Sequence, residues 1–95
     1  MKVLELLHEP TAWTQEASAR ASDFEEVGVF DGMATCWCIS GALDKCYPGF
    51  DRSKEAQKVM DAITTLFPDN CDTIASFNDK ATHEQVIEVL TLAGV

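Results

Sequence analysis

The spacing of apolar positions along the chain predicts a mainly α fold of four to five helices in a single domain, residues 1–95. The clearest apolar stripe lies in residues 51–67, where large apolar side chains recur at the 3.6-residue spacing of one helix face. Residues 33–46 are apolar over more than half of a helical wheel, so we expect a central helix that is buried among the others. Residues 2–9 predict a short first helix. Residues 11–22 are rich in Ala and small polar side chains and predict a weaker second helix.

The last predicted helix has the best-marked start. Thr82 stands at the N-cap position and Gln85 follows three residues later, which is the capping-box pattern. Glu84 in the first turn suits the positive end of the helix dipole. From the stripes of all the predicted helices we expect a core that includes Leu4, Leu7, Trp37, Cys38, Leu43, Val59, Met60, Ile63, Phe67, Val86 and Leu90.

One stretch favours β structure instead. Residues 24–30 contain two Phe and two Val residues, and Asp31 and Gly32 form a turn signal directly after them. We therefore expect a short β-hairpin near residues 24–30, with an irregular loop as the alternative. Further along the chain, residues 71–77 are compatible with either a helical turn or a short extended segment.

Composition and charge exclude several classes of protein. With 95 residues, 46% of them hydrophobic and 24% charged, the chain fits one folded domain. It has 16 acidic and 7 basic side chains and a formal net charge of −9, so we expect no direct binding of nucleic acid through its phosphates. No apolar run approaches the ~20 residues of a membrane span, so we expect no membrane partner. The first ten residues contain Glu5 and His8 and do not resemble a signal peptide, which predicts a cytoplasmic protein.

Cysteine use agrees with a reducing compartment. The four cysteines are Cys36, Cys38, Cys46 and Cys71. Without a secretory signal we expect buried free thiols, no disulfides, and no metal or cofactor. Two alternatives stay open. Some of the cysteines could bind zinc with His83, although the C-x-C pattern lacks the spacing of a zinc knuckle. Cys36 or Cys38 could also act as a nucleophile, with His83 as base and Asp79 orienting it, but nothing in the spacing selects these residues.

Several short motifs resemble a family of small proteins. The motifs are Trp13-Thr14-Gln15, Cys36-Trp37-Cys38 followed by Gly41-Ala42-Leu43, Phe77-Asn78-Asp79, and Thr82-His83-Glu84. Together, over about residues 1–93, they resemble a family of bacteria and their phages that is catalogued as a domain of unknown function. The resemblance implies a mostly helical cytosolic protein, suggests a phage origin and supplies no activity. The stretch from Arg20 to Met33 departs from the family, because it lacks the long polar, Gly-containing insert.

The marked residues of these motifs have a structural interpretation, which we favour, and a functional one. In the structural interpretation Asn78-Asp79 makes a turn, Thr82 caps a helix, His83 bonds a nearby carbonyl or carboxylate, and both Trp side chains fill the core. In the functional interpretation a flat small ligand stacks on Trp, and polar groups from His83 and Asn78 orient it. The ligand pocket of this alternative consists of Trp13, Trp37, Asn78, Asp79 and His83.

The acidic side chains are the other candidate feature. The densest acidic stretch runs from Asp23 to Asp31 and contains no basic side chain. It is either a solvated face that keeps a small protein soluble, or a surface that docks on a basic groove by imitating the charge of nucleic acid. Our functional hypothesis is a non-enzymatic, phage-encoded protein that binds and inhibits a basic nucleic-acid-handling protein of host or phage, as anti-CRISPR proteins do. The binding residues are then Asp23, Glu25, Glu26 and Asp31. An exposed apolar stripe would also permit a homodimer.

Overall fold

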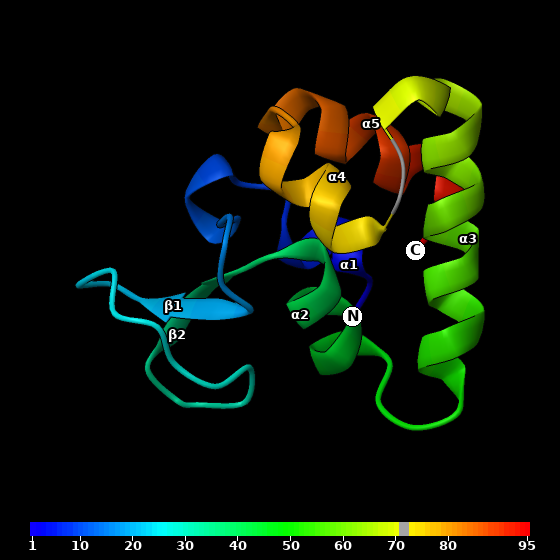
Figure 1. Cartoon of the computed structure of the whole chain (residues 1–95). Coiled ribbons are helices and arrows are strands. Elements are labelled where there is room, and N and C mark those ends of the chain that lie inside the picture. Colours follow the sequence, from blue (N-terminus) through cyan, green and yellow to red (C-terminus); the bar gives the residue numbers. More distant parts are fainter. Residues whose placement is uncertain (71–72) are drawn as a thin grey trace.

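Helices dominate the structure, a computed structural model that describes residues 1–70 and 73–95 and confirms the mainly α class (Figure 1). In these residues the α-helices are α1 (Val3–Leu6), α2 (Ile39–Cys46), α3 (Asp51–Leu66), α4 (Ile74–Lys80) and α5 (His83–Ala93). There are also two 3-10 helices, η1 (Pro10–Ala12) and η2 (Pro68–Asn70), and an antiparallel hairpin of β1 (Ala19–Ala21) and β2 (Ala34–Trp37).

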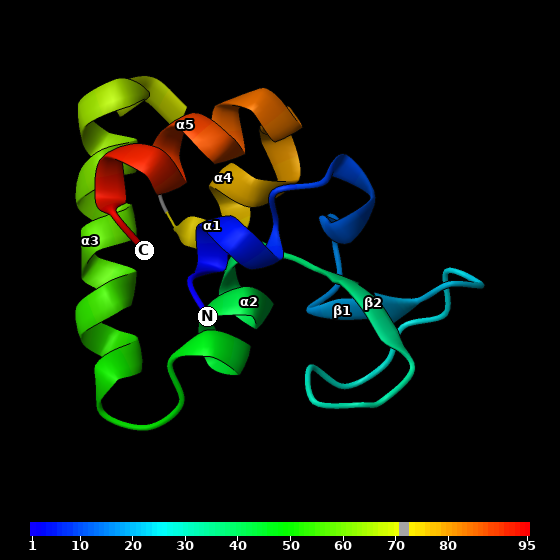
Figure 2. The same cartoon turned by 180° about the vertical axis from the view of Figure 1, so that it is seen from behind.

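The helices form one body, and the hairpin extends from its side. In Figures 1 and 2, α3 runs along one end of the molecule, and β1 and β2 lie at the opposite end. Helices α1, α2, α4 and α5 occupy the space between them. The molecule measures 34 × 27 × 20 Å. The connection between β1 and β2, residues 22–33, lies at the same end as the hairpin, and its Val27 and Val29 pack against the edge of the core.

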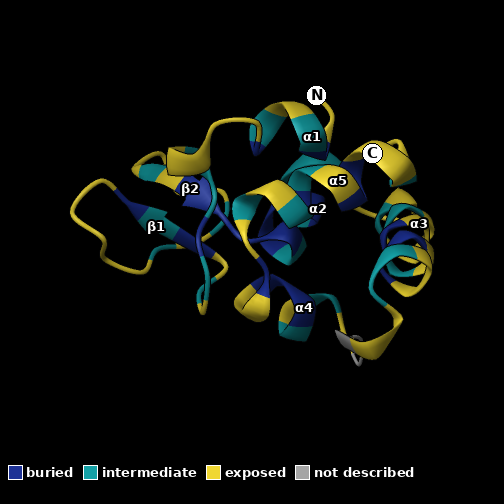
Figure 3. Ribbon diagram, turned by 90° about the horizontal axis from the view of Figure 1, so that it is seen from above, coloured by how far each residue is buried: buried dark blue, intermediate teal, exposed yellow. Residues whose placement is uncertain are grey.

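The core lies where the apolar faces of α2, α3 and α5 meet. Leu43, Ile63 and Leu90, one from each helix, are fully buried. Figure 3 shows buried segments in the interior and exposed segments along the outer faces of the helices. Of the expected core, Leu7, Trp37, Cys38, Leu43, Val59, Ile63, Val86 and Leu90 are buried, and Leu4, Met60 and Phe67 are half-buried at its edge.

The expected cap of α5 is confirmed. The side-chain oxygen of Thr82 accepts a hydrogen bond from the backbone N–H of Gln85 at 3.2 Å, and the backbone N–H of Thr82 donates to Gln85 Oε1 at 2.9 Å. The capping box therefore closes in both directions. At the other end Gly94 has a φ of 75°, a left-handed conformation that glycine adopts without strain, and the helix stops there.

The weaker second helix expected over residues 11–22 is wrong. Only η1 is helical there, the chain then becomes extended, and Ala19–Ala21 forms β1. Ala19 and Ala21 are buried and Arg20 between them is half-buried, which is the alternation of a strand. Ala favours a helix in isolation, but pairing with β2 outweighs that local preference.

The central helix expected over residues 33–46 is shorter than predicted, because its first part is β2. The expected hairpin is present, but its strands flank residues 24–30 instead of lying within them. Cys38 directly follows β2 and caps α2, where its Sγ accepts a hydrogen bond from the N–H of Gly41 at 3.2 Å. A short buried strand and a buried helix both appear as an apolar run, so the pattern could not separate them.

Residues 74–77 begin α4, which confirms the helical alternative for them, while Cys71 and Asp72 lie outside the described residues. Asn78 and Asp79, expected to form a turn, lie within α4, so that prediction is wrong. Their side chains bond to distant parts of the chain instead of competing for their own backbone. The helix therefore continues through a pair that is typical of turns.

The close contact between Gly41 and Ser18 generates a first prediction. A Cβ at Gly41 would overlap the carbonyl oxygen of Ser18. We expect Gly41→Ala to lower the free energy of unfolding by about 2 kcal/mol, because overpacking forces the backbone to move. Gly28→Ala is the matched control, because no atom lies within 4 Å of a Cβ there. Urea unfolding followed by circular dichroism compares the two, and equal midpoints would contradict the packing.

Candidate functional site

The residues of the sequence motifs meet at the side chain of Asn78, which is completely buried. Its Oδ1 accepts hydrogen bonds from Trp13 Nε1 at 2.8 Å and from the backbone N–H of Ile39 at 3.0 Å. Its Nδ2 donates to the carbonyl of Thr14 at 3.1 Å and to Asp79 Oδ1 at 3.3 Å. The amide therefore uses its full hydrogen-bonding capacity within the chain.

Gln15 and Glu16 extend this network along the same segment. Gln15 Nε2 donates to the carbonyls of Asn78 at 3.0 Å and Ala81 at 3.1 Å. The backbone N–H of Glu16 donates to Asp79 Oδ1 at 2.8 Å. The Trp-Thr-Gln motif therefore binds the C-terminal end of α4 and gives partners to carbonyls that the helix itself leaves unpaired.

His83 lies next to this network at the start of α5. Its Nε2 is 2.8 Å from the carbonyl oxygen of Leu7, and its ring centre is 5.8 Å from that of Trp13, with the planes tilted by 48°. Because a carbonyl only accepts hydrogen bonds, Nε2 carries the proton when the ring is neutral. His83 therefore joins α5 to the residues that follow α1.

The structure brings together the residues of the predicted ligand pocket, except for the side chain of Trp37. The backbone carbonyl of Trp37 accepts from the N–H of Thr14 at 3.0 Å, but its Nε1 donates to the carbonyl of Val29 at 3.0 Å on the β1–β2 connection. The polar atoms that were expected to meet a ligand are bonded within the chain. This arrangement supports the structural interpretation of the motifs.

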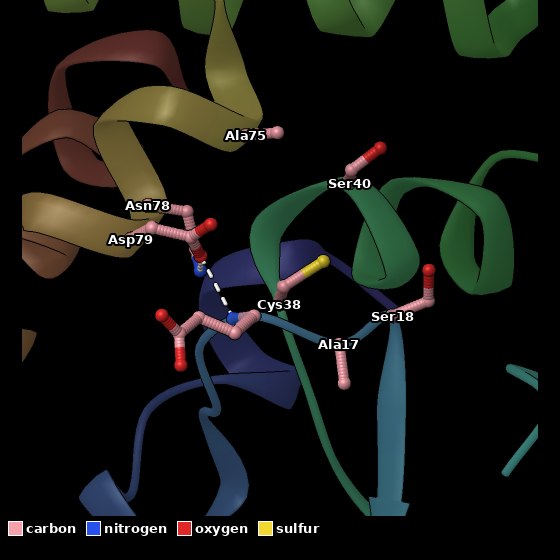
Figure 4. Close-up of a pocket in the computed structure, with 8 residues that line it drawn as sticks. Ala17, Ser18, Cys38, Ser40, Ala75, Asn78 and Asp79 are labelled. Atoms are coloured by element: carbon pink, nitrogen blue, oxygen red, sulfur yellow. Dashed lines mark hydrogen bonds between the residues drawn. The ribbon is translucent and has the colours of Figure 1, made fainter. Parts of the chain in front are cut away.

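A hollow of about 290 Å³ lies beside Asn78, between α2, α4 and the segment that precedes β1 (Figure 4). It is lined by Glu16, Ala17, Ser18, Cys38, Ser40, Ala75, Asn78 and Asp79. Figure 4 shows Cys38 and Ser40 on the α2 side and Asn78 and Asp79 on the α4 side. A reactive Cys38 thiol would have to meet its substrate in this hollow.

The surroundings of Cys38 do not activate its thiol. Burial raises the pKa of this thiol, the N–H groups of Gly41 and Ser40 oppose the shift, and the carboxylate of Asp79 adds to it. The thiol is therefore protonated at neutral pH and is a weak nucleophile. His83, the expected base, does not line the hollow. The structure places Asp79 near Cys38 and leaves His83 out of this group.

The other described cysteines also pack as free thiols. Cys36 Sγ lies 3.7 Å from the carbonyl oxygen of Arg20, and burial raises the pKa of the Cys46 thiol. Within residues 1–70 and 73–95, no three His, Cys, Asp or Glu side chains are placed to hold a metal ion. Cys71 lies outside the described residues. The described residues therefore provide no set of ligands for the zinc alternative.

The four acidic residues proposed for partner binding all lie exposed on the connection between β1 and β2. Asp23 Oδ1 accepts from the N–H of Glu25 at 3.1 Å, and Asp31 Oδ1 accepts from the N–H of Met33 at 2.8 Å. These bonds shape the connection locally. They leave most of the hydrogen-bonding capacity of both carboxylates free for a partner.

Sequence reasoning missed three exposed apolar side chains on this connection and the role of Gln15. Phe24 is 68% exposed, and Phe30 and Met33 are each 66% exposed. For Phe30 and Met33 a signal was present, because both flank an Asp-Gly turn in a stretch without basic side chains. The role of Gln15 depends on carbonyls more than sixty residues away and leaves no local pattern.

The fold and the site define a small mainly α domain with a lateral hairpin, organised around a buried asparagine. The chain belongs to the family of unknown function DUF6197, whose model matches residues 1–94. This match confirms the expectation of a family without a known activity. No curated protein and no solved structure matches the chain. In the part of the chain that is described, no helix is long and apolar enough to span a bilayer.

The Asn78 network generates a stability prediction. In Asn78→Ala the indole N–H of Trp13 and the N–H of Ile39 lose their acceptor, and the carbonyl of Thr14 loses its donor. We expect a loss of about 3 kcal/mol, because buried polar groups are left unpaired. Gln57→Ala removes an exposed amide and serves as the control, with an expected change within about 0.5 kcal/mol. Urea unfolding measures both, and wild-type stability of Asn78→Ala would contradict the role of the network.

The raised pKa of Cys38 predicts slow alkylation in the folded state. We expect iodoacetamide to label this thiol much more slowly in the native protein than in denaturant, and faster as the pH rises above the ordinary thiol range. Because the unfolded thiol ionises first as the pH rises, the same shift also lowers the stability of the fold at alkaline pH. Peptide mass spectrometry measures the rates, and rapid labelling of native Cys38 at neutral pH would show an activated thiol instead.

Proposed function

We propose that the protein is a non-enzymatic interaction protein whose connection between β1 and β2, residues 22–33, binds the basic surface of a partner protein. We name this connection the acidic loop. It carries four exposed carboxylates and no basic side chain, and the carboxylates are those of Asp23, Glu25, Glu26 and Asp31. The observation that supports the proposal most strongly is that the same loop also exposes Phe30 and Met33.

Phe30 and Met33 distinguish the acidic loop from a merely solvated face. Each is 66% exposed, whereas most large apolar side chains of the helices pack in the core or against it, with Leu92 of α5, at 54% exposed, as an exception. Covering such side chains is favourable by about 25 cal/mol per Å² of apolar surface. Protein interfaces combine an apolar centre of this kind with a polar rim. The carboxylates of the acidic loop supply that rim and give it one sign of charge.

The acidic loop is anchored before any partner binds. Trp37 Nε1 donates to the carbonyl of Val29 at 3.0 Å. Lys45 Nζ lies 5.3 Å from the centre of the Trp37 ring and 5.9 Å from that of Phe30. A segment that is ordered beforehand loses less conformational entropy on binding. This anchoring therefore supports a role of the loop in recognition.

The charge of the whole chain favours a partner that normally handles nucleic acid. A net charge of −9 attracts a basic groove and accelerates association by electrostatic steering. In its specific form, the proposal is that the protein acts for a phage in the cytoplasm and occupies the groove of a host defence protein, including a CRISPR nuclease. Charge complementarity is the support for this form.

The alternatives draw less support from the geometry. A ligand between Trp13, Trp37 and His83 would have to compete with hydrogen bonds that the chain already makes. A thiol enzyme would need an ionised Cys38, and the raised pKa of that thiol disfavours it. A homodimer stays a prediction that sedimentation of the purified chain tests.

Neutralising the acidic loop tests the proposal. The tagged protein captures its partner from host lysate at low salt, and mass spectrometry identifies what elutes as the salt is raised. The variant with Asp23→Asn, Glu25→Gln, Glu26→Gln and Asp31→Asn removes four charges, while each Asn can still accept the local backbone hydrogen bond. We expect the variant to bind the purified partner at least about tenfold more weakly and with a flatter salt dependence.

The matched control removes four exposed charges elsewhere, with Glu9→Gln, Asp61→Asn, Asp69→Asn and Glu88→Gln. It should bind like the wild type apart from a small loss of long-range steering. A second variant with Phe30→Ser and Met33→Ser keeps every charge and should slow association little but accelerate dissociation. Equal losses in the neutralised loop and in the control would assign the effect to net charge and overturn the acidic loop as the binding surface.

A further inference from the structure

We propose that a hollow between Trp13 and Phe24 binds a small zwitterion with a flat apolar group, that is, an aromatic α-amino acid or a close chemical relative. The hollow has a volume of about 280 Å³ and is lined by Trp13, Thr14, Gln15, Glu16, Arg20 and Phe24. This volume is at the small end of ligand sites, which suits a metabolite of this size. The charged groups of the hollow lie outside the acidic loop, so the inference does not rest on the proposed function.

Opposite charges line the hollow. Arg20 supplies a guanidinium and Glu16 a carboxylate. Although the chain has 16 acidic and 7 basic side chains, Arg20 makes no ion pair in the part that is described. Its Nη1 donates to the carbonyl of Phe24 at 3.1 Å and its Nη2 to that of Gln15 at 3.5 Å, while the buried Nε has no partner. A guanidinium offers five donors, so a ligand carboxylate can add the missing counter-charge.

Aromatic surface faces the same space. Phe24 is 68% exposed, its ring lies 4.2 Å from the guanidinium carbon of Arg20, and it lines the hollow together with the half-buried Trp13. The indole of Trp13 is held by its hydrogen bond to Asn78. A second hollow of about 460 Å³ shares Trp13, Thr14 and Phe24 with the first and leaves room for a ring. A flat group that enters there can contact both aromatic side chains.

Two of the residues that line this hollow have a strained backbone. Glu16 has a φ of 63° and Phe24 a φ of 70°, and within the described residues these are the non-glycine positions with positive φ. Such conformations cost about 1–3 kcal/mol and cluster at ligand clamps. Hydrogen bonds hold both residues there, from the N–H of Glu16 to Asp79 Oδ1 at 2.8 Å and from the N–H of Phe24 to the carbonyl of Ala21 at 2.9 Å. Both strained residues line the hollow together with Arg20.

Titration of the 95-residue chain with L-phenylalanine, followed by NMR, tests for binding. A concentration of about 10 mM detects dissociation constants in the millimolar range. We expect shifts of the Trp13 indole N–H and of the amides of Glu16 and Phe24, with no comparable shift at the exposed Phe50. No shift at any concentration would overturn the proposal. Shifts at Phe50 as large as those at Phe24 would also overturn it, because they would show generic stacking on exposed rings.

Matched ligands and variants then test the charges. Phenethylamine lacks the carboxylate and N-acetyl-phenylalanine lacks the ammonium group, and each should bind at least about tenfold more weakly than phenylalanine. Arg20→Gln should weaken binding of phenylalanine but not of phenethylamine. Glu16→Gln should weaken binding of phenylalanine but not of N-acetyl-phenylalanine. Lys54→Gln, which removes an exposed cation from α3, is the control and should leave all three affinities unchanged.

The test of charge recognition does not depend on the folding of any single variant. Arg20 also bonds two carbonyls of the chain, so circular dichroism must show that Arg20→Gln is folded. If that variant does not fold, Glu16→Gln and the two ligand analogues still carry the comparison. Analogues that bind the wild type as tightly as phenylalanine would show an apolar contact without charge recognition and would overturn the zwitterion site.

Discussion

The four hydrogen bonds of the Asn78 amide are the interaction on which the rest of the structure depends. Burying an amide without partners costs about 2–7 kcal/mol, so this side chain has to be fully satisfied for the core to close. Its partners come from three parts of the chain: the segment before β1, the first residue of α2, and α4 itself. The bond from the N–H of Ile39 also satisfies a donor that the start of α2 would leave unpaired. One side chain thereby sets where the hairpin joins the helical body.

The parts of the fold that the sequence could predict are those with local signals. Helix α3 follows from an apolar stripe at helical spacing, and α5 follows from Thr82 and Gln85, whose side chains act within one turn. The hairpin could be recognised as β structure near residues 24–30, but not placed. Its strands are the short segments Ala19–Ala21 and Ala34–Trp37 on either side, and the residues that pair are 13 to 18 positions apart.

The parts that could not be predicted depend on long-range partners. Asn78 and Asp79 look like a turn because their side chains often bond the neighbouring backbone, yet here they bond residues 13, 14 and 16 and leave the helix intact. Of the candidate pocket residues, Trp13, Asn78, Asp79 and His83 adjoin, whereas the side chain of Trp37 bonds Val29 instead. No sequence pattern, in contrast, marks Arg20 as a candidate binding residue. Its significance rests on the absence of an ion pair in the described chain, which only three-dimensional placement reveals.

The hollow and the acidic loop meet at Phe24, which lines the first and belongs to the second. Glu16, which also lines the hollow, is attached to the helical body, because its N–H donates to Asp79 on α4. The hollow therefore spans the junction between the helical body and the loop, and its width depends on how the two are placed. Binding free energies that share such a junction are linked reciprocally: a ligand that changes the affinity for a partner has its own affinity changed by the same factor. The coupling would act through the position of Phe24, because Phe30 is held separately by Lys45 and its neighbour Val29 by Trp37. If Phe24 is rigid, the hollow and the acidic loop bind independently. If Phe24 moves with the loop, binding of a partner to the loop changes the affinity of the hollow for its ligand.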